Sequence, residues 1–214
     1  MRGDQRNKNY KVVWNSEFAY VIGLIATDGC LSKDGRHIVM RSSDIEQLEN
    51  FKKCLKINNK ICETYNNGYA KKPAYRVQVS NTTLYKYLLS IGLTPNKTKT
   101  IGSLEIPTAY FFDFLRGCID GDGCIRRYQD SIYPKSERVY TKLSSSSETF
   151  LKWIQSYIKD LLSIKGYLNK GNGTQELIFA KKESLKLLNK IYQNPKAVGL
   201  NRKYVIVASL LERN

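Results

Sequence analysis

The segment FAYVIGLIATDGC occupies residues 18–30, and FFDFLRGCIDGDGC occupies residues 111–124. Each is an apolar stretch that contains an internal glycine and ends in Asp-Gly-Cys. Apolar residues at this density predict a helix that is buried rather than one that lies on the surface. Gly29 and Gly123 follow at the position where a helix end favours a residue with positive φ. The chain is therefore expected to contain two equivalent halves, each built around one buried helix.

The residues that follow each segment also match between the halves. Strands are predicted at residues 36–43, 60–65 and 69–80 of the first half, and at residues 125–129, 138–144, 166–170 and 174–180 of the second. Capping-box sequences at 43–46 and 145–148 predict helix starts, and further helices are expected at 83–91 and 183–192. Each half therefore reads α-β-β-α-β-β-α. The predicted fold class is α+β, with two pseudo-twofold-related subdomains whose antiparallel sheets carry helices on one face only.

The two halves are expected to join near Pro107. Residues 104–110 form the predicted linker, which is short enough that the halves should pack as one body. The predicted domains are residues 1–106, with the motif at 21–29, and residues 107–214, with the motif at 115–123. Hairpin turns are predicted at residues 66–68 and 171–173 because Asn and Gly dominate both.

The charge of the chain indicates a polyanionic partner. Lys and Arg number 35 against 19 Asp and Glu, which gives a formal net charge of +16. Residues 1–110 and residues 111–214 each carry a net charge of +8, so the excess is not a basic tail. Two equally basic halves favour contact with one extended polyanion, although a high surface charge can also serve solubility alone.

Cysteine and histidine usage excludes several classes of protein. Five cysteines without a CxxC pair, and His37 as the only histidine, predict reduced thiols in an intracellular protein and no Cys/His zinc site. A ββα-metal nuclease would need more histidines, and the Glu-x-Lys spacing of restriction-type enzymes does not occur. The sequence has no apolar run of about 18 residues and no secretory signal at residues 1–11, so neither a membrane nor secretion is expected.

Residues 21–29, VIGLIATDG, and residues 115–123, LRGCIDGDG, resemble the two motifs of the single-chain, monomeric LAGLIDADG homing endonucleases. The resemblance extends over residues 14–204, which is essentially the whole chain. It implies a Mg²⁺-dependent endodeoxyribonuclease that hydrolyses both strands of a long, pseudo-palindromic DNA target and leaves 3′-hydroxyl and 5′-phosphate ends. It also implies metal ligation by Asp28, Asp122 and the backbone carbonyls of Thr27 and Gly121.

Elementary electrostatics favours a metal site at the same place. Gly23 and Gly117 would let two helices cross at close range, which brings Asp28 and Asp122 together at helix C-termini. The helix dipole and the neighbouring carboxylate both disfavour an anion there. Oxygen ligands of this kind suit Mg²⁺. The resemblance implies two or three divalent ions, and it implies that Ca²⁺ binds without supporting cleavage. A single Asp-Gly is usually a turn, but two in equivalent places of a basic repeat favour catalysis.

Two further features bear on the site. The sixth motif position is Asp120 in the second copy but Ala26 in the first, which puts the local hydrogen bonding of the first half in question. The resemblance also implies a lysine late in each half, and Lys97 and Lys203 occupy matching segments, GLTPNK and GLNRK. They are the predicted catalytic lysines that stabilise charge on the reacting phosphate or tune the attacking water; the alternative is an ordinary solvated loop lysine. Their nearest substitutes are Lys99 and Arg202.

The two sheets are expected to form a saddle that reads double-stranded DNA in the major groove. The loop at residues 130–135, which the first half lacks, is expected to reach the DNA backbone. Tyr75, Val77 and Val79 are expected to face the core. The predicted DNA contacts are polar residues of the free faces and turns, namely Lys33, Arg36, Arg41, Tyr69, Lys71, Arg76, Gln78, Arg126, Tyr128, Arg138, Tyr140, Lys142, Asn169, Lys170 and Gln175.

Two alternative functions remain open. An RNA maturase that assists splicing of its host intron would share this fold and charge. A non-catalytic DNA-binding regulator could be built on the same repeat, but it would have little need of both Asp28 and Asp122. The richness in Lys, Asn, Ile and Tyr indicates an AT-rich genome, and an intron-encoded origin is expected in a bacterium, a phage or an organelle, mitochondrion or chloroplast.

Overall fold

The computed structural model describes residues 12–64, 73–130, 132–133, 137–171 and 173–212. The first half contains α1 (Ser16–Thr27), β1 (Gly29–Leu31), β2 (His37–Ser42), α2 (Ile45–Leu55), β3 (Cys62–Thr64), β4 (Ala74–Ser80) and α3 (Thr82–Ser90). The second half contains α4 (Phe111–Asp122), β5 (Gly123–Gln129), β6 (Glu137–Ser145), α5 (Glu148–Leu162), β7 (Tyr167–Lys170), β8 (Gln175–Phe179), α6 (Lys181–Ile191) and α7 (Asn201–Leu211). The predicted order of elements is therefore present twice, with α7 added at the end.

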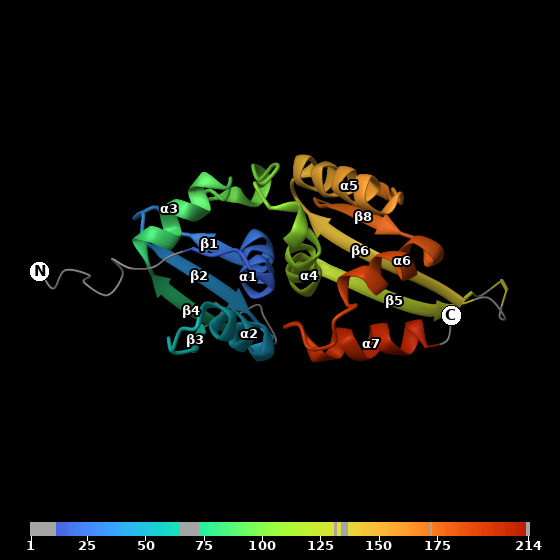
Figure 1. Ribbon diagram of the computed structural model, residues 1–214, viewed down its shortest axis with the longest axis horizontal. Helices are drawn as coiled ribbons and strands as arrows, with labels where there is room; N and C mark the ends of the chain where they lie inside the picture. The colour runs from blue at the N-terminus through green and yellow to red at the C-terminus, as the bar shows by residue number, and fades with distance from the viewer. Residues whose placement is uncertain (1–11, 65–72, 131, 134–136, 172, 213–214) are drawn as a thin grey trace, which may run out of the picture.

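The two halves form two lobes that meet along a pair of helices. Each lobe has a four-stranded antiparallel sheet, in the order β1-β2-β4-β3 in one and β5-β6-β8-β7 in the other. Figure 1 shows α1 and α4 side by side between the sheets, at the centre of the molecule. The α+β class and the pseudo-symmetric arrangement expected from the repeat are confirmed.

Alternation along the strands determines which face of each sheet is covered. In β2 the side chains of Ile38 and Met40 are fully buried, and in β4 those of Val77 and Val79 are buried as expected. Residues that alternate with these buried ones, such as Arg41 and Gln78, are exposed on the opposite face. One face of each sheet thus packs on helices while the other is left open, so that basic side chains on the strands are free to meet a ligand.

The glycines that follow the motif aspartates differ from the expectation. Gly123 has φ −92° and ψ 149°, which is extended backbone, and Gly29 also lacks a positive φ. Both begin a strand directly after the helix. A Cβ at Gly29 would lie 2.6 Å from Cα of Ile25, and one at Gly123 would lie 2.5 Å from Cα of Ile119. Glycine is required because the chain folds back on its own helix, so the prediction of a positive φ was wrong.

The helix starts also differ in detail. The side chain that caps α2 belongs to Asp44, which accepts from the amide of Glu46, and Ser147 caps α5 by accepting from the amide of Phe150. The predicted capping residues at 43 and 145 were therefore misplaced by one and two positions. β6 continues through Ser145, which delays the helix. Lys203, for which a solvated loop lysine was the alternative, lies in the first turn of α7.

Some expectations fall outside the described residues. Outside them lie the predicted turn at residues 66–68 and two predicted DNA contacts, Tyr69 and Lys71. The division of the chain at residue 107 stays a prediction, although Leu104 and Ile106 of the connecting segment are buried. None of the helices in the described part of the chain is long and apolar enough to cross a membrane.

Candidate active site

The crossing of α1 and α4 is tight because glycine faces glycine. A Cβ at Gly23 would lie 2.1 Å from the carbonyl oxygen of Phe114, and one at Gly117 would lie 2.1 Å from the carbonyl oxygen of Tyr20. Neither position has room for any side chain, since the obstacle is backbone in both cases. The two helices therefore approach as closely as their backbones allow, in the way the repeated glycines predict.

This crossing brings the ends of the two helices together. Asp28 follows the last residue of α1, and Asp122 is the last residue of α4. A Cβ at Gly121 would lie 2.1 Å from Oγ1 of Thr27 and 2.5 Å from Oδ2 of Asp28. The four residues predicted as metal ligands thus lie at one place, where the C-terminal ends of α1 and α4 meet.

The two carboxyl groups are electrostatically strained. Burial, and then the charge of Asp28, raise the pKa of Asp122 to about 6. Burial also raises the pKa of Asp28, against the effect of hydrogen bonds from Gln47 and Thr27. A proton or a cation would relieve this repulsion, so the pair is suited to binding positive charge.

A buried lysine accompanies each carboxylate. Lys97 is 6% exposed and its Nζ donates to the carbonyl oxygen of Gly29 at 2.6 Å. Lys203 is 3% exposed and its Nζ donates to the carbonyl oxygens of Gly123, at 2.9 Å, and of Ile119. The two lysines therefore occupy equivalent places, each beside the glycine that follows a motif aspartate.

Burial distinguishes these lysines from ordinary surface lysines. It lowers the pKa of Lys97, and it lowers the pKa of Lys203 to about 8. The nearest substitutes behave differently: Lys99 is exposed, and Arg202 is exposed with its Nε 3.1 Å from Oδ2 of Asp44. An opening of about 250 Å³ lies against Lys97 and Asp122 and is also lined by Ala26, Thr27, Thr98, Ile101, Ser144, Ser145, Ser146 and Thr174.

Gln47 belongs to the site but was not predicted from the sequence. Its Nε2 donates to Oδ2 of Asp28 at 2.8 Å, and its Oε1 accepts from Oγ of Ser42 at 2.5 Å. Gln47 is the third residue after its helix cap, and the same position after the cap of α5 is Phe150, which cannot donate. The two halves of the site are therefore not chemically equivalent. A single glutamine in an amphipathic helix carries no signal in the sequence that would have identified it as a site residue.

The substitution of Ala26 for the motif aspartate has a structural explanation. In the second half, Asp120 accepts from the hydroxyl of Tyr20 at 2.9 Å, the hydroxyl of Tyr192 at 3.1 Å and the amide of Leu200 at 2.8 Å. In the first half, the amide of Leu93, which corresponds to Leu200, donates to the carbonyl of Leu88 instead. The first half needs no carboxylate there because its backbone already supplies the acceptor.

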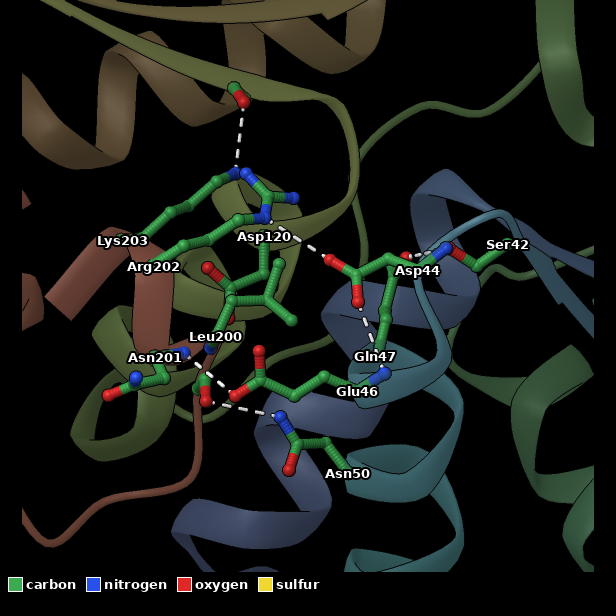
Figure 2. Close-up of polar contacts among 12 residues, drawn as sticks. Ser42, Asp44, Glu46, Gln47, Asn50, Asp120, Leu200, Asn201, Arg202 and Lys203 are labelled. Atoms are coloured by element: carbon green, nitrogen blue, oxygen red, sulfur yellow. Dashed lines mark hydrogen bonds and ion pairs between the residues drawn. The ribbon is translucent and has the colours of Figure 1, made fainter. Parts of the chain in front are cut away.

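The start of α7 is held from the other half of the protein. No side chain of its own caps this helix. Instead, the amide of Asn201 donates to Oε1 of Glu46 at 2.8 Å, and Nδ2 of Asn50 donates to the carbonyl of Gly199 at 3.1 Å. Figure 2 shows these α2 side chains directed at the residues that precede Lys203. The second catalytic lysine candidate is thus positioned by contacts with the first half.

Replacement of Asp120 by alanine is expected to lower the free energy of unfolding by about 3 kcal/mol, because three buried donors lose their acceptor. The melting temperature should fall by about 10 °C. Asp160 is exposed on α5, so its change to alanine serves as a control and should cost less than about 0.5 kcal/mol. Chemical denaturation of both variants measures the difference, and equal stabilities would contradict the anchoring role of Asp120.

The open sheet faces hold most of the predicted nucleic-acid contacts. In the first half, Arg41 is paired in register with Arg76, and Gln78 lies beside Val39. In the second half, Arg126 lies opposite Tyr140, and Tyr128 opposite Arg138. Lys33 and Arg36 are exposed near the turn before β2, and Lys142 and Asn169 lie on the open face of β6 and β7. Lys170 pairs in register with Gln175 and therefore lies on the opposite face of its strand, so its expected place on the open face was wrong.

Several of these predicted contacts, among them Arg138, Lys142 and Gln175, have protein partners instead of being free. Nε of Arg138 lies 2.5 Å from Oδ2 of Asp130, and Nζ of Lys142 lies 3.0 Å from Oε2 of Glu176. Side chains of β8 alternate between the two faces of the sheet, so Gln175 lies on the same helix-facing side as the buried Leu177. Nε2 of Gln175 donates to a carboxylate oxygen of Glu148 in α5 at 2.9 Å. The expectation that Gln175 lies on the open face was wrong, because the strand register is set by the buried Leu177 and Phe179.

Comparisons with known proteins agree with this architecture. A family model described as a LAGLIDADG-like domain matches residues 15–92 and again residues 111–192. No match to a curated protein was significant. Two structural neighbours are homing endonucleases. I-WcaI, bound to its DNA recognition sequence, has a TM-score of 0.67 and 10% sequence identity; the match covers 94% of this chain and 89% of that chain. Mesophilic variants of I-DmoI have a TM-score of 0.57 and 15% sequence identity; the match covers 91% of this chain and 97% of that chain.

A third neighbour has a different description. Full-length DUF199/WhiA from Thermotoga maritima has a TM-score of 0.60 and 18% identity, over 96% of this chain and 63% of that chain. The chain thus spans less than two thirds of that protein. The same fold occurs in proteins described as homing endonucleases and in one that is not, so the architecture alone does not specify DNA cleavage.

Proposed function

Because the chain belongs to the LAGLIDADG family, we propose that it is a site-specific endonuclease that hydrolyses double-stranded DNA with divalent metal ions held by Asp28 and Asp122. The observation that carries this proposal is the meeting of two strained carboxylates, one from each half, with one buried lysine beside each. A protein that only binds DNA would gain nothing from this costly arrangement.

The donor set at the helix ends fits Mg²⁺. Two carboxylates and the backbone carbonyls of Thr27 and Gly121 provide oxygen ligands only, which is the preference of a hard cation. Burial raises the pKa of both carboxyl groups, so their negative charge is poorly compensated by the protein and favours a bound cation. When bound, the metal would polarise the phosphate and lower the pKa of an attacking water.

The side chains around the carboxylates have distinct roles in this proposal. Gln47 holds the carboxylate of Asp28 in one orientation through its 2.8 Å hydrogen bond. Lys97 and Lys203 present ammonium groups that would neutralise charge on the reacting phosphate of each strand. Hydrolysis adds water across one phosphodiester per strand and leaves a 5′-phosphate and a 3′-hydroxyl. The DNA would lie across the open faces of both sheets, and one monomer would contact both halves of an asymmetric, pseudo-palindromic target.

A non-catalytic DNA-binding role is the second candidate, favoured by the fold shared with DUF199/WhiA. One experiment separates the two. Incubation with a randomised DNA library in Mg²⁺ and in Ca²⁺, followed by sequencing of cut and of bound molecules, reports activity, target and metal dependence together. The endonuclease proposal expects cutting in Mg²⁺ and binding alone in Ca²⁺. Bound but uncut DNA in Mg²⁺ would indicate the regulator.

Binding of DNA is expected to weaken steeply with salt, because each phosphate contact releases a condensed counterion. With about six phosphate contacts the affinity should fall about a thousandfold between about 50 and 200 mM salt. Lys33→Gln, at an exposed position near the turn before β2, should reduce the logarithmic salt slope by about one. Lys159→Gln, exposed on the helix-covered side, is the matched control and should leave the slope unchanged. Fluorescence anisotropy titrations at several salt concentrations measure both, and a flat salt response would contradict the basic saddle.

A further inference from the structure

The open faces of the two sheets differ in chemistry. The described residues of the first face include two arginines, Arg41 and Arg76, together with Gln78, and no tyrosine. The second face also has two arginines, Arg126 and Arg138, but carries in addition three tyrosines, Tyr128 on β5, Tyr140 on β6 and Tyr167 on β7. The two parts of a bound target would therefore meet different surfaces.

The three tyrosines surround a hollow on the second face. Its volume is about 340 Å³, and Arg126, Lys142 and Ile178 complete its lining together with Asn169. The rings of Tyr128 and Tyr140 are stacked with centroids 6.1 Å apart, while Tyr128 and Tyr167 remain 51% and 49% exposed. Ile178 lies in register with both Lys142 and Tyr167, so it forms an apolar floor between them. The hollow is thus lined by three aromatic rings and one aliphatic side chain, Ile178, with Arg126, Lys142 and Asn169 beside them.

The chemistry of a duplex restricts what can occupy such a hollow. Base faces are stacked in double-stranded DNA, so a protein in the major groove meets only base edges. The apolar feature of those edges is the 5-methyl group of thymine, whereas guanine and adenine offer hydrogen-bonding atoms that suit Arg and Gln. The tyrosines come from three different strands, β5, β6 and β7, so their rings can contact the methyl groups of thymines at neighbouring base pairs while Arg126 remains near phosphates.

We propose that the tyrosine-lined hollow on β5–β8 binds the 5-methyl groups of thymines, so that the half of the DNA target under the second sheet is specified by thymine. The half under the first sheet is then specified by hydrogen bonds from Arg and Gln. This inference rests on the proposed function only as far as DNA binding, since it concerns recognition and not cutting.

Replacement of thymine by deoxyuridine tests the proposal, because it removes the methyl group and nothing else. The target is taken from the bound fraction of the randomised library, and deoxyuridine is placed in one half of it at a time. We expect about a fourfold loss of affinity for each methyl group that the hollow contacts, in one half only. The variants Tyr128→Ser and Tyr167→Ser should bind the thymine and deoxyuridine targets equally. Leu89→Ser, which removes an apolar side chain that is 39% exposed on α3 and outside the hollow, should keep the wild-type discrimination.

The outcomes separate recognition from catalysis. Equal affinity of the wild type for both targets, or discrimination that survives in Tyr128→Ser and Tyr167→Ser, overturns the methyl-binding hollow. If Mg²⁺ still supports cleavage of both targets in that case, the endonuclease proposal stands. Circular dichroism of the serine variants verifies folding, which is expected because both tyrosines are half exposed.

Discussion

Replacement of Asp122 by asparagine is expected to slow strand cleavage at least about a thousandfold while it leaves DNA affinity within about threefold of the wild type. Asparagine keeps the shape of the side chain but removes the charge that would hold a divalent ion, and such an ion is worth several kcal/mol to the reaction. The phosphate contacts proposed for the sheets do not involve this residue. Single-turnover cleavage and equilibrium binding of the same duplex measure the two quantities.

The same variant should be more stable than the wild type without metal. The pKa of Asp122 is raised from its ordinary 3.8 to about 6, so the folded protein binds this proton more tightly than the unfolded chain. The wild type therefore loses stability as the pH rises from about 4 to about 6, and at neutral pH the charged carboxylate is destabilising. Asp160→Asn, at an exposed position of α5, is the control and should change neither cleavage nor stability. Unimpaired cleavage by Asp122→Asn would exclude this carboxylate from the chemistry.

Replacement of Gly117 by alanine is expected to disrupt the whole molecule rather than the active site alone. The added Cβ would lie 2.1 Å from the carbonyl oxygen of Tyr20 and 3.0 Å from Cα of Gly23. Backbone cannot move aside cheaply, so α1 and α4 must separate, and the carboxylates at their ends separate with them. The free energy of unfolding should fall by about 3 kcal/mol or more, and cleavage should be lost together with stability.

Gly102→Ala is the matched control for that substitution. A Cβ at Gly102 would meet only a methyl group of Thr149, at 3.8 Å, which is ordinary contact. Thermal unfolding of the two variants should therefore differ by about 10 °C. Equal melting temperatures would mean that the helices do not cross as closely as the structure has them.

The sequence predicted the parts of the fold that depend on repetition and on local pattern. Two apolar segments ending in Asp-Gly-Cys were enough to predict the buried helices, and alternation in β2 and β6 identified the open faces of both sheets. The approach of Gly23 to Gly117 followed from the presence of glycine at equivalent positions. These features depend on residues close together in the chain or on the comparison of one half with the other.

The parts that were missed depend on contacts between residues far apart in the sequence. The role of Gln47 arises because α2 packs beside the end of α1, and no local pattern encodes that distance. The amide of Leu200 needs Asp120 only because the chain returns across α4, a contact over 80 residues. Gly29 and Gly123 were assigned the wrong conformation because a strand that starts directly after a helix requires a small residue without requiring positive φ. Lys97 and Lys203 were predicted from the resemblance, whereas their burial required the structure.

Asp28 and Asp122 are proposed to hold divalent ions jointly. The number of Mn²⁺ ions bound to the protein–DNA complex measures this property. Electron paramagnetic resonance reports free Mn²⁺, so the ions bound beyond those held by the DNA alone can be counted for the wild type, for the double variant Asp28→Asn, Asp122→Asn, and for Asp160→Asn. We predict about two additional ions for the wild type and for Asp160→Asn, and none for the double variant. The same number of ions in all three proteins would contradict a metal site between the two halves.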